Sequence, residues 1–250
     1  MVKVVGRETT RKLRGAFFTP AEMVDFVVSW AVREPRDSLF EPSCGEAGFL
    51  LSAASRLRVL GSQANLRTQL HAIEIHRESA ETADRVLQHA GFSADIAVGD
   101  FFDVKASPQY DAVIGNPPYV RYQQFSGIDS AKALRAALAH GVRLTQLASS
   151  WAAFTVHAAQ FLKPEGRLGL VLPAELLTVN YAAEVRRFLL RRFRSVRLVM
   201  FEALVFPGVM EEVVLLLAEG SGGTRRFEIF QAKDLNDLHR LDSRSWSGFI

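Results

Sequence analysis

Short apolar segments alternate with amphipathic helical patterns along most of this chain. Such alternation is typical of a mostly parallel sheet that helices cover on both faces. We therefore predict an α/β fold with a sheet of seven strands. The strands are expected at Ser38 to Glu41, Leu70 to Glu74, Asp95 to Val98, Tyr110 to Gly115, Leu168 to Leu172, Val196 to Phe201 and Glu212 to Leu217.

Helical periodicity marks most of the connections between these strands. Thr19-Pro20 is typical of a helix start, with Thr19 as the N-cap and Pro20 at the first helical position. This helix is expected to end near Pro35. Further helices are expected at about Ala47 to Leu60, Arg77 to Ala90, Ser130 to Ala139, Trp151 to Leu162 and Tyr181 to Arg192.

The composition indicates a globular protein with one full core and no membrane partner. Of the 250 residues, 48% are hydrophobic and 23% are charged. No apolar run approaches a membrane span, and the basic segment Met1 to Arg14 lacks the apolar stretch of a secretory signal. The lone Cys44 excludes an internal disulfide framework, and the histidines show no metal-ligand spacing. We expect a cytoplasmic protein without a metal site.

The segment Asn116-Pro117-Pro118-Tyr119 ends the fourth expected strand. Two prolines cannot extend a strand, so the segment predicts a stiff loop with one amide, exposed carbonyls and an aromatic ring. The side-chain oxygen of Asn116 and the carbonyl of Pro117 could both accept hydrogen bonds from an NH2 group, while Tyr119 stacks on the ring that bears it. Taken alone, the segment also fits an ordinary turn.

A turn that contains Gly45 connects the first expected strand to the next helix. Ligands of doubly wound sheets bind at the carboxyl ends of the strands, where glycine permits close backbone approach. The spacing of Gly45 and Gly48 differs from the dinucleotide fingerprint. Glu41, at the end of the strand, disfavours a bare pyrophosphate and favours a cationic ligand, such as one with a sulfonium and an ammonium. A solvent-facing strand end is the alternative.

Acidic residues also follow the second and third expected strands. Glu74, next to Ile75, stands where an acid reaches ribose hydroxyls in such folds. Asp100 could accept a hydrogen bond from an adenine amino group while Phe101 packs against its ring. Each of these residues alone also fits a turn or a core position. Three acids at successive strand ends, with an asparagine after the fourth strand, indicate one ligand along the row.

Two segments depart from this alternation. The connection from Arg121 to Leu147 is long, polar and interrupted by one short helix, and it leaves directly from Tyr119. We therefore expect it to act as a lid or a substrate contact. Periodicity is lost after the last expected strand, so we predict a catalytic domain at 1–220 and a segment at 221–250 that departs from it.

Together these motifs resemble those of S-adenosylmethionine-dependent DNA adenine-N6 methyltransferases of the gamma type, the catalytic part of restriction–modification enzymes. That family has a Phe-x-Thr-Pro element, a Glu/Asp-Pro-x-Cys-Gly turn, a strand-end acid, Asp-Phe, Asn-Pro-Pro-Tyr and a late Phe-Pro. The chain matches them in this order at Phe17 to Pro20, Glu41 to Gly45, Glu74, Asp100-Phe101, Asn116 to Tyr119 and Phe206-Pro207. The resemblance implies a Rossmann-like methyltransferase fold with a last antiparallel strand.

The resemblance also implies how S-adenosylmethionine is bound. The Phe-x-Thr-Pro element and the first turn would contact its methionine end, the second strand-end acid its ribose, and the Asp-Phe pair its adenine. Glu46 is larger than the residue in many relatives, so its effect on cofactor affinity is open. The cofactor-binding residues would be Phe17, Thr19, Glu41, Ser43, Gly45, Glu74, Ile75, Asp100, Phe101 and Asn116.

The same resemblance implies that Asn116 and the Pro117 carbonyl bind the N6 amino group of adenine in double-stranded DNA. Tyr119 would stack on the flipped base, and Phe206 would pack on its edge or other face. Two acceptors would draw the amino group towards tetrahedral geometry and free its lone pair for attack on the methyl group. Catalysis would then depend on positioning more than on a general base.

Other readings stay open. Asn-Pro-Pro-Tyr also occurs in RNA and protein-glutamine methyltransferases, although the Phe-x-Thr-Pro and late Phe-Pro elements favour DNA adenine. A cofactor-binding or nucleic-acid-binding module without activity would keep the same pocket. The residues after the last expected strand are too few for a recognition domain, so we expect a fragment, or else recognition by a partner or by the long connection.

Overall fold

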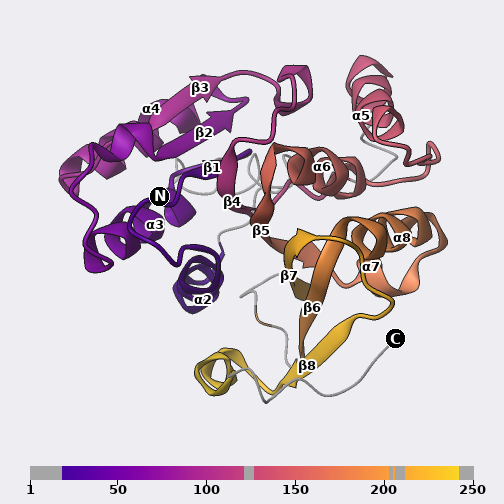
Figure 1. Cartoon of the computed structure of the whole chain (residues 1–250). Helices are drawn as coiled ribbons and strands as arrows, with labels where there is room; N and C mark the ends of the chain where they lie inside the picture. Colours follow the sequence, from indigo (N-terminus) through magenta and orange to yellow (C-terminus); the bar gives the residue numbers. More distant parts are fainter. Residues whose placement is uncertain (1–18, 121–126, 203–204, 206–211, 242–250) are drawn as a thin grey trace, which may run out of the picture.

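The computed structural model describes residues 19–120, 127–202, 205 and 212–241. Their strands form one sheet in the order β3-β2-β1-β4-β5-β7-β6-β8 (Figure 1). The strands are β1 (Leu39–Glu41), β2 (Leu70–Glu74), β3 (Asp95–Val98), β4 (Tyr110–Gly115), β5 (Leu162–Pro173), β6 (Phe193–Phe201), β7 (Val213–Ser221) and β8 (Glu228–Ala232). Neighbouring strands are parallel except in the two pairs that include β7. The predicted α/β class and the late antiparallel strand are confirmed.

The predicted number of seven strands is wrong, because the described residues already form a sheet of eight. The additional strand, β8, lies in the segment that was expected to depart from the fold, and it pairs in parallel with β6 at the edge of the sheet. Of its five residues only Ala232 is fully buried. A short, half-covered edge strand leaves a weak hydrophobic pattern, which explains why the sequence did not indicate it. The division into domains stays a prediction.

Helices cover both faces of the sheet (Figure 1). One layer contains α2, α3 and α4, and the other contains α6, α7 and α8, with α5 packed on α6. Adjacent residues of β4 point to different layers: Val113 joins the core of the α6 side, and Ile114 joins that of the α2 side. The helices are α2 (Ala21–Ala31), α3 (Gly48–Val59), α4 (Arg77–His89), α5 (Gly127–Ala139), α6 (Ser150–Ala158), α7 (Glu175–Thr178) and α8 (Ala183–Arg192). Short 3-10 turns are η1 (Leu66–Thr68), η2 (Phe101–Asp103), η3 (Ala159–Phe161), η4 (Asn180–Ala182) and η5 (Leu235–Arg240).

Helix α2 starts differently from the prediction. Pro20 is its N-cap, with φ −53° and ψ 141°, and no side chain caps the helix. The Pro20 carbonyl accepts hydrogen bonds from the backbone N–H groups of Met23 and Val24, both at 3.1 Å. The expected capping role of Thr19 is therefore wrong, because its hydroxyl is hydrogen-bonded to the side chain of Asn116 instead.

A close approach between α2 and β5 depends on Gly169. A Cβ atom at this position would lie 2.7 Å from Cγ1 of Val27 in α2, which is far inside ordinary contact distance. Glycine thus lets the helix lie directly on the strand.

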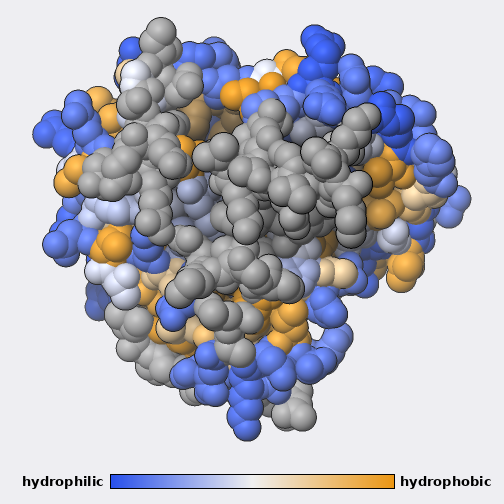
Figure 2. Space-filling model, turned by 180° about the vertical axis from the view of Figure 1, so that it is seen from behind, coloured by the Kyte–Doolittle hydropathy of each residue, from blue (hydrophilic) through white to orange (hydrophobic). Residues whose placement is uncertain are grey.

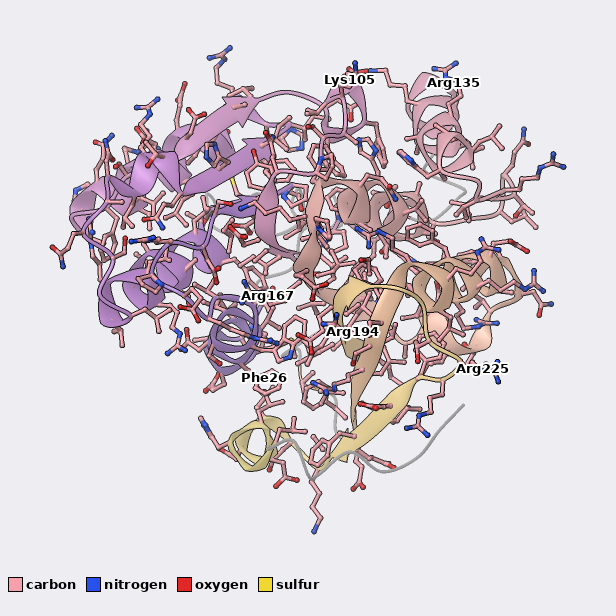
Figure 3. The ribbon with its side chains drawn as sticks, viewed as in Figure 1. Phe26, Lys105, Arg135, Arg167, Arg194 and Arg225 are labelled. Carbon is pink, nitrogen blue, oxygen red and sulfur yellow. The ribbon has the colours of Figure 1, made fainter. Side chains whose placement is uncertain are left out.

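The outer side of α2 is covered by the chain after β8. Figure 3 shows Phe26 pointing from α2 towards η5. Phe26 packs against the same core cluster that contains Leu238 of η5, and Leu235 packs there as well. The described part of the segment after residue 220 therefore returns to the fold and packs on its first described helix.

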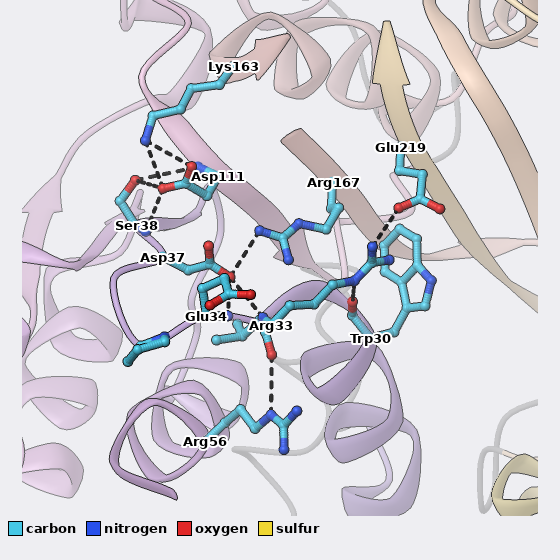
Figure 4. A network of polar contacts seen from close by, with 12 residues as sticks. Trp30, Arg33, Glu34, Asp37, Ser38, Arg56, Asp111, Lys163, Arg167 and Glu219 are labelled. Carbon is cyan, nitrogen blue, oxygen red and sulfur yellow. Dashed lines mark hydrogen bonds and ion pairs between the residues drawn. The ribbon is translucent and has the colours of Figure 1, made fainter. Parts of the chain in front are cut away.

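A buried polar network holds the edge of the sheet where β1 and β4 begin (Figure 4). Oδ2 of Asp37 accepts hydrogen bonds from the backbone N–H groups of Arg33 at 2.8 Å and Glu34 at 3.0 Å. The same oxygen forms an ion pair with Arg167 of β5 at 2.9 Å. Asp37 and Arg167 are only 5% and 7% exposed. The network lies away from the carboxyl ends of β1 and β4, so it stabilises the framework.

The coloured part of the rim in Figure 2 is mostly hydrophilic, and hydrophobic residues form smaller areas between the hydrophilic ones. The longest helices in the described ranges, α4 and α5, have 13 residues each. None of the helices described is long and apolar enough to cross a membrane.

Candidate active site

The carboxyl ends of β1, β2 and β4 meet at one edge of the sheet. β1 pairs in parallel with β2 on one side and with β4 on the other. The chain runs outward from β1 to β3 and then returns to β4, so the strand order reverses between β1 and β4. Glu41 is the last residue of β1, and Asn116 directly follows β4. This is the switch point at which open α/β sheets bind ligands.

Glu41 is buried at this point, and one of its oxygens has no partner in the part of the chain that the structure describes. The residue is 2% exposed, and its Oε2 has no hydrogen-bond partner among the described residues. Burial raises the pKa of Glu41 well above its ordinary value of 4.5, and the nearby Glu74 raises it further, while the Leu50 backbone N–H acts in the opposite direction. A carboxyl group in this state favours a cationic partner, which would stabilise its charged form.

Glu74 organises the turn that contains Gly45. Its Oε2 accepts a hydrogen bond from the N–H of Gly45 at 3.0 Å, and its Oε1 accepts one from the N–H of His76 at 2.9 Å. Gly45 and Ala47 both have a left-handed backbone, with φ of 52° and 70°. Glu74 therefore holds the turn in place, and each carboxylate oxygen keeps a further lone pair for a ligand hydroxyl.

Only one end of the Asn116 amide has a hydrogen-bond partner in the described ranges of the chain. Nδ2 donates to the hydroxyl of Thr19 at 3.1 Å, while Oδ1 is buried and has no partner among the described residues. The Asn116 backbone carbonyl accepts a hydrogen bond from the hydroxyl of Ser43 at 3.5 Å. A Cβ atom at Gly115, where φ is 151°, would lie 3.6 Å from Cγ of Glu41, so the two strand ends are close.

The loop after Asn116 carries Tyr119, whose hydroxyl donates to the Val171 carbonyl of β5 at 2.9 Å. The ring packs against both core clusters and is only partly buried. Pro117, whose carbonyl was predicted to bind the amino group, is buried beside it. The geometry places both residues at the switch point, and their roles towards a base remain predictions.

Asp100 lies at the end of β3, and both of its oxygens are engaged. Oδ1 accepts from the N–H of Phe102 at 2.9 Å, and Oδ2 forms an ion pair with Lys132 of α5 at 3.2 Å. Lys132 also pairs with Asp103 at 2.6 Å, and hydrogen bonds to these two acids raise its pKa. The sequence did not indicate that Lys132 contacts Asp100, because Lys132 belongs to no motif and lies in the long connection after Tyr119.

Phe101, which was predicted to pack against the adenine ring of the cofactor, lies mostly in the core. It is 5% exposed. Its ring centroid lies 4.6 Å from that of Phe154, 4.7 Å from His157 and 5.5 Å from Phe161. These rings leave Phe101 little surface for a ligand adenine.

Ile75 is 59% exposed directly after Glu74, so an apolar side chain is free to contact a ligand at the end of β2.

Cys44 is buried and forms no disulfide, and burial raises the pKa of its thiol, as expected for a packed residue. Phe17 and Phe206, which the resemblance assigned to the cofactor and to the target base, lie outside the described residues.

Comparisons with known proteins identify the family. A family model described as N-6 DNA Methylase matches residues 7–221. The type II methyltransferase M.HincII of Haemophilus influenzae is 26% identical over 234 residues, covering 92% of this chain and 40% of that protein. M.PaeR7I of Pseudomonas aeruginosa is 28% identical over 244 residues, covering 85% of this chain and 42% of the relative. The chain thus spans about two fifths of the length of these relatives.

A solved structure has the same fold. The methyltransferase subunit of a type I restriction-modification system from Streptococcus thermophilus superposes with a TM-score of 0.67 at 19% identity, covering 86% of this chain and 47% of that one. At this identity the likeness concerns the fold alone. Since the family model covers far more than half of the sequence, the chain belongs to the N-6 DNA methylase family.

Proposed function

We propose that this chain is the catalytic part of an S-adenosylmethionine-dependent DNA adenine-N6 methyltransferase of a restriction–modification system. The observation that carries the proposal is a pair of buried acceptor atoms at the switch point, Oε2 of Glu41 and Oδ1 of Asn116, without partners among the described residues. A buried carboxylate suits a cation, and a lone amide oxygen suits an amino group. Membership of the N-6 DNA methylase family supports DNA as the substrate and N6 as the position.

The residues around the first turn fit the methionine end and ribose of S-adenosylmethionine. When bound, this cofactor supplies an electrophilic methyl group on a sulfonium. Glu41 would hold the cationic end, with the hydroxyls of Thr19 and Ser43 beside it. Each carboxylate oxygen of Glu74 already accepts one backbone N–H, from Gly45 or His76. The remaining lone pairs would accept hydrogen bonds from ribose hydroxyls.

The adenine of the cofactor would lie over the ends of β2 and β3. Ile75 offers exposed apolar surface there. Asp100 would accept from the adenine amino group while keeping its ion pair with Lys132, because a carboxylate has about four acceptor positions. Phe101 would support this pocket mainly from the core.

The target amino group would be held by Asn116 and the Pro117 carbonyl. Oδ1 of Asn116 is already directed away from the Thr19 contact, so little reorganisation is needed when the amino group arrives. Two acceptors favour the tetrahedral geometry that frees the lone pair on nitrogen. The base would leave the duplex, and stacking on Tyr119 would offset part of the few kcal/mol that unstacking costs.

Recognition of the DNA sequence is assigned to a part of the enzyme outside this fold, either a further domain or a separate specificity subunit. The curated relatives are more than twice as long as the matched region, which supports such a part. We expect the enzyme to act in the cytoplasm. RNA or protein methylation remains the second candidate, since the acceptor pair would bind other amides or amines.

The test compares the full-length protein with its Asn116→Ala variant. Both are incubated with labelled S-adenosylmethionine and with DNA, RNA or protein, and methylated products are identified by mass spectrometry. N6-methyladenine in DNA should form with the wild type and fall by about 100-fold or more with the variant, a loss far larger than any change in cofactor binding measured by calorimetry. Near-normal transfer by the variant, or product only in RNA or protein, would contradict the proposal.

A further inference from the structure

One buried serine holds the backbone on both sides of Tyr119. Ser150 is the first residue of α6 and is 3% exposed. Its hydroxyl donates to the carbonyl of Pro118 at 2.5 Å and accepts from the N–H of Val120 at 2.9 Å. Its own N–H donates to the Val120 carbonyl at 3.0 Å. A single residue therefore satisfies three backbone groups that flank Tyr119.

The ring of Tyr119 is fixed at its other end by β5. The phenol hydroxyl donates to the carbonyl of Val171 at 2.9 Å. The side chain therefore spans two anchors, the backbone clamp from α6 and a strand carbonyl. Both anchors lie on rigid elements, because every residue of α6 is buried and Val171 is in the sheet core.

The chemistry of the loop explains why an outside residue is required. Pro117 and Pro118 lack backbone N–H groups, so this stretch cannot form a regular ladder of hydrogen bonds. The remaining polar groups need a partner that donates and accepts within one short side chain, which a serine hydroxyl does. Alanine in place of Ser150 would remove the hydroxyl that bonds the Pro118 carbonyl and the Val120 N–H.

We propose that Ser150 is a positioning residue for Tyr119, which sets the height and tilt of the ring relative to Oδ1 of Asn116. A base stacked on that ring would then present its amino group to the amide. The inference rests on the proposed function. Neither the motifs nor the family resemblance includes Ser150, which lies outside the Asn-Pro-Pro-Tyr motif and reaches it only through the fold.

Ser149 provides a matched control. It precedes Ser150, is 7% exposed, and its hydroxyl is hydrogen-bonded to Tyr181 instead of the loop. Ser149→Ala removes a buried hydroxyl from the same helix start and leaves the clamp intact. Ser150→Cys is a second clamp variant, since the thiol fills the space of the hydroxyl but forms only weak hydrogen bonds.

The variants are compared in the full-length protein by the kcat of DNA methylation, the Kd of S-adenosylmethionine and hydrogen exchange at the Val120 amide. Ser150→Ala and Ser150→Cys should lower kcat by about 10-fold to 100-fold, because the reacting groups are misplaced, with an unchanged cofactor Kd. Both should expose the Val120 amide to exchange. Ser149→Ala should keep kcat within about twofold of the wild type and keep Val120 protected.

Equal kcat losses in Ser149→Ala and Ser150→Ala, or a protected Val120 amide in both Ser150 variants, would overturn the inference. If Ser150→Ala does not fold, Ser150→Cys decides by the same measurements. If the wild type methylates no DNA, the proposed function fails. Exchange at Val120 then still decides whether Ser150 holds the loop.

Discussion

The hydroxyl oxygen of Thr19 lies 3.1 Å from Nδ2 of Asn116 and accepts its hydrogen bond. This contact joins residues that are 97 positions apart and decides which end of the amide faces the protein. With Nδ2 engaged, Oδ1 is the end that has no partner among the residues that the structure describes. The reverse orientation would direct two N–H donors at an incoming amino group and would repel it.

Removal of this contact should impair methyl transfer more than cofactor binding. Thr19→Val deletes the acceptor and should lower the single-turnover rate on DNA by about threefold to tenfold, the value of one modest hydrogen bond. Thr19→Ser keeps the hydroxyl and should stay near the wild-type rate. Calorimetry measures the Kd of S-adenosylmethionine for each variant and so distinguishes a loss of cofactor binding from a loss of rate. An equal rate loss in both variants would show that the methyl group of Thr19 matters, not its hydroxyl.

Binding of the cationic cofactor should release a proton from Glu41. The pKa of Glu41 is raised in the folded protein, so its carboxyl group stays protonated at pH values above 4.5, the ordinary pKa of this side chain. A bound cation favours the ionised form. The affinity for S-adenosylmethionine should therefore increase as pH rises from 4.5, by up to about tenfold per pH unit. It should level off above the raised pKa of Glu41. Without cofactor, stability should fall over the same window, since the folded state binds more protons than the unfolded state.

Calorimetry in buffers of different ionisation enthalpy measures this proton release. Glu41→Gln should abolish the release and weaken binding. The exposed Glu22→Gln, in the first turn of α2, is the control and should behave as the wild type. Proton release that persists in Glu41→Gln would assign it to another group.

Packing of α2 on β5 should be sensitive to a single methyl group. Gly169→Ala places a Cβ atom 2.7 Å from Val27, so the free energy of unfolding in urea should fall by about 1–3 kcal/mol. Gly48→Ala is the control, because no heavy atom lies within 4 Å of its Cβ position. A loss at Gly48 as large as that at Gly169 would mean that close packing is not the cause.

Replacement of one partner of the buried ion pair between Asp37 and Arg167 should strongly lower the free energy of unfolding. Arg167→Met leaves the Asp37 carboxylate buried without its cation and should lower the free energy of unfolding by about 3–5 kcal/mol. Arg67→Met breaks the exposed pair with Asp95 and should cost about 1 kcal/mol or less. Urea unfolding of both variants measures the difference, and similar losses would argue against a special role for the buried pair.

The fold was predictable from the sequence where local periodicity is strong. The strands ending at Glu41, Glu74 and Gly115 lie where they were expected, because each is a short and largely apolar run. The same periodicity did not indicate β8, since an edge strand is half exposed. It also assigned Thr19 to a helix cap, because a local pattern cannot show that a distant amide binds the hydroxyl.

Sequence reasoning was least successful where a residue depends on partners far along the chain. Phe101 was predicted to pack against the cofactor adenine, and the sequence did not show that Phe154 and Phe161 lie beside its ring. Lys132 and Ser150 carry no motif, yet one pairs with Asp100 and the other holds the loop around Tyr119. These contacts form only when α5 and α6 pack beside the strand ends.

By itself, the sequence determined the α/β class, the order of acids at the strand ends and the stiffness of the Asn-Pro-Pro-Tyr loop. These properties follow from residue types and their spacing within a few positions. Only the tertiary structure decided which buried polar atoms have no partner among the described residues, and these include Oε2 of Glu41 and Oδ1 of Asn116. The physical reason is that a hydrogen bond is made by atoms that meet in space, and Thr19 meets Asn116 only after α2 has packed on β5.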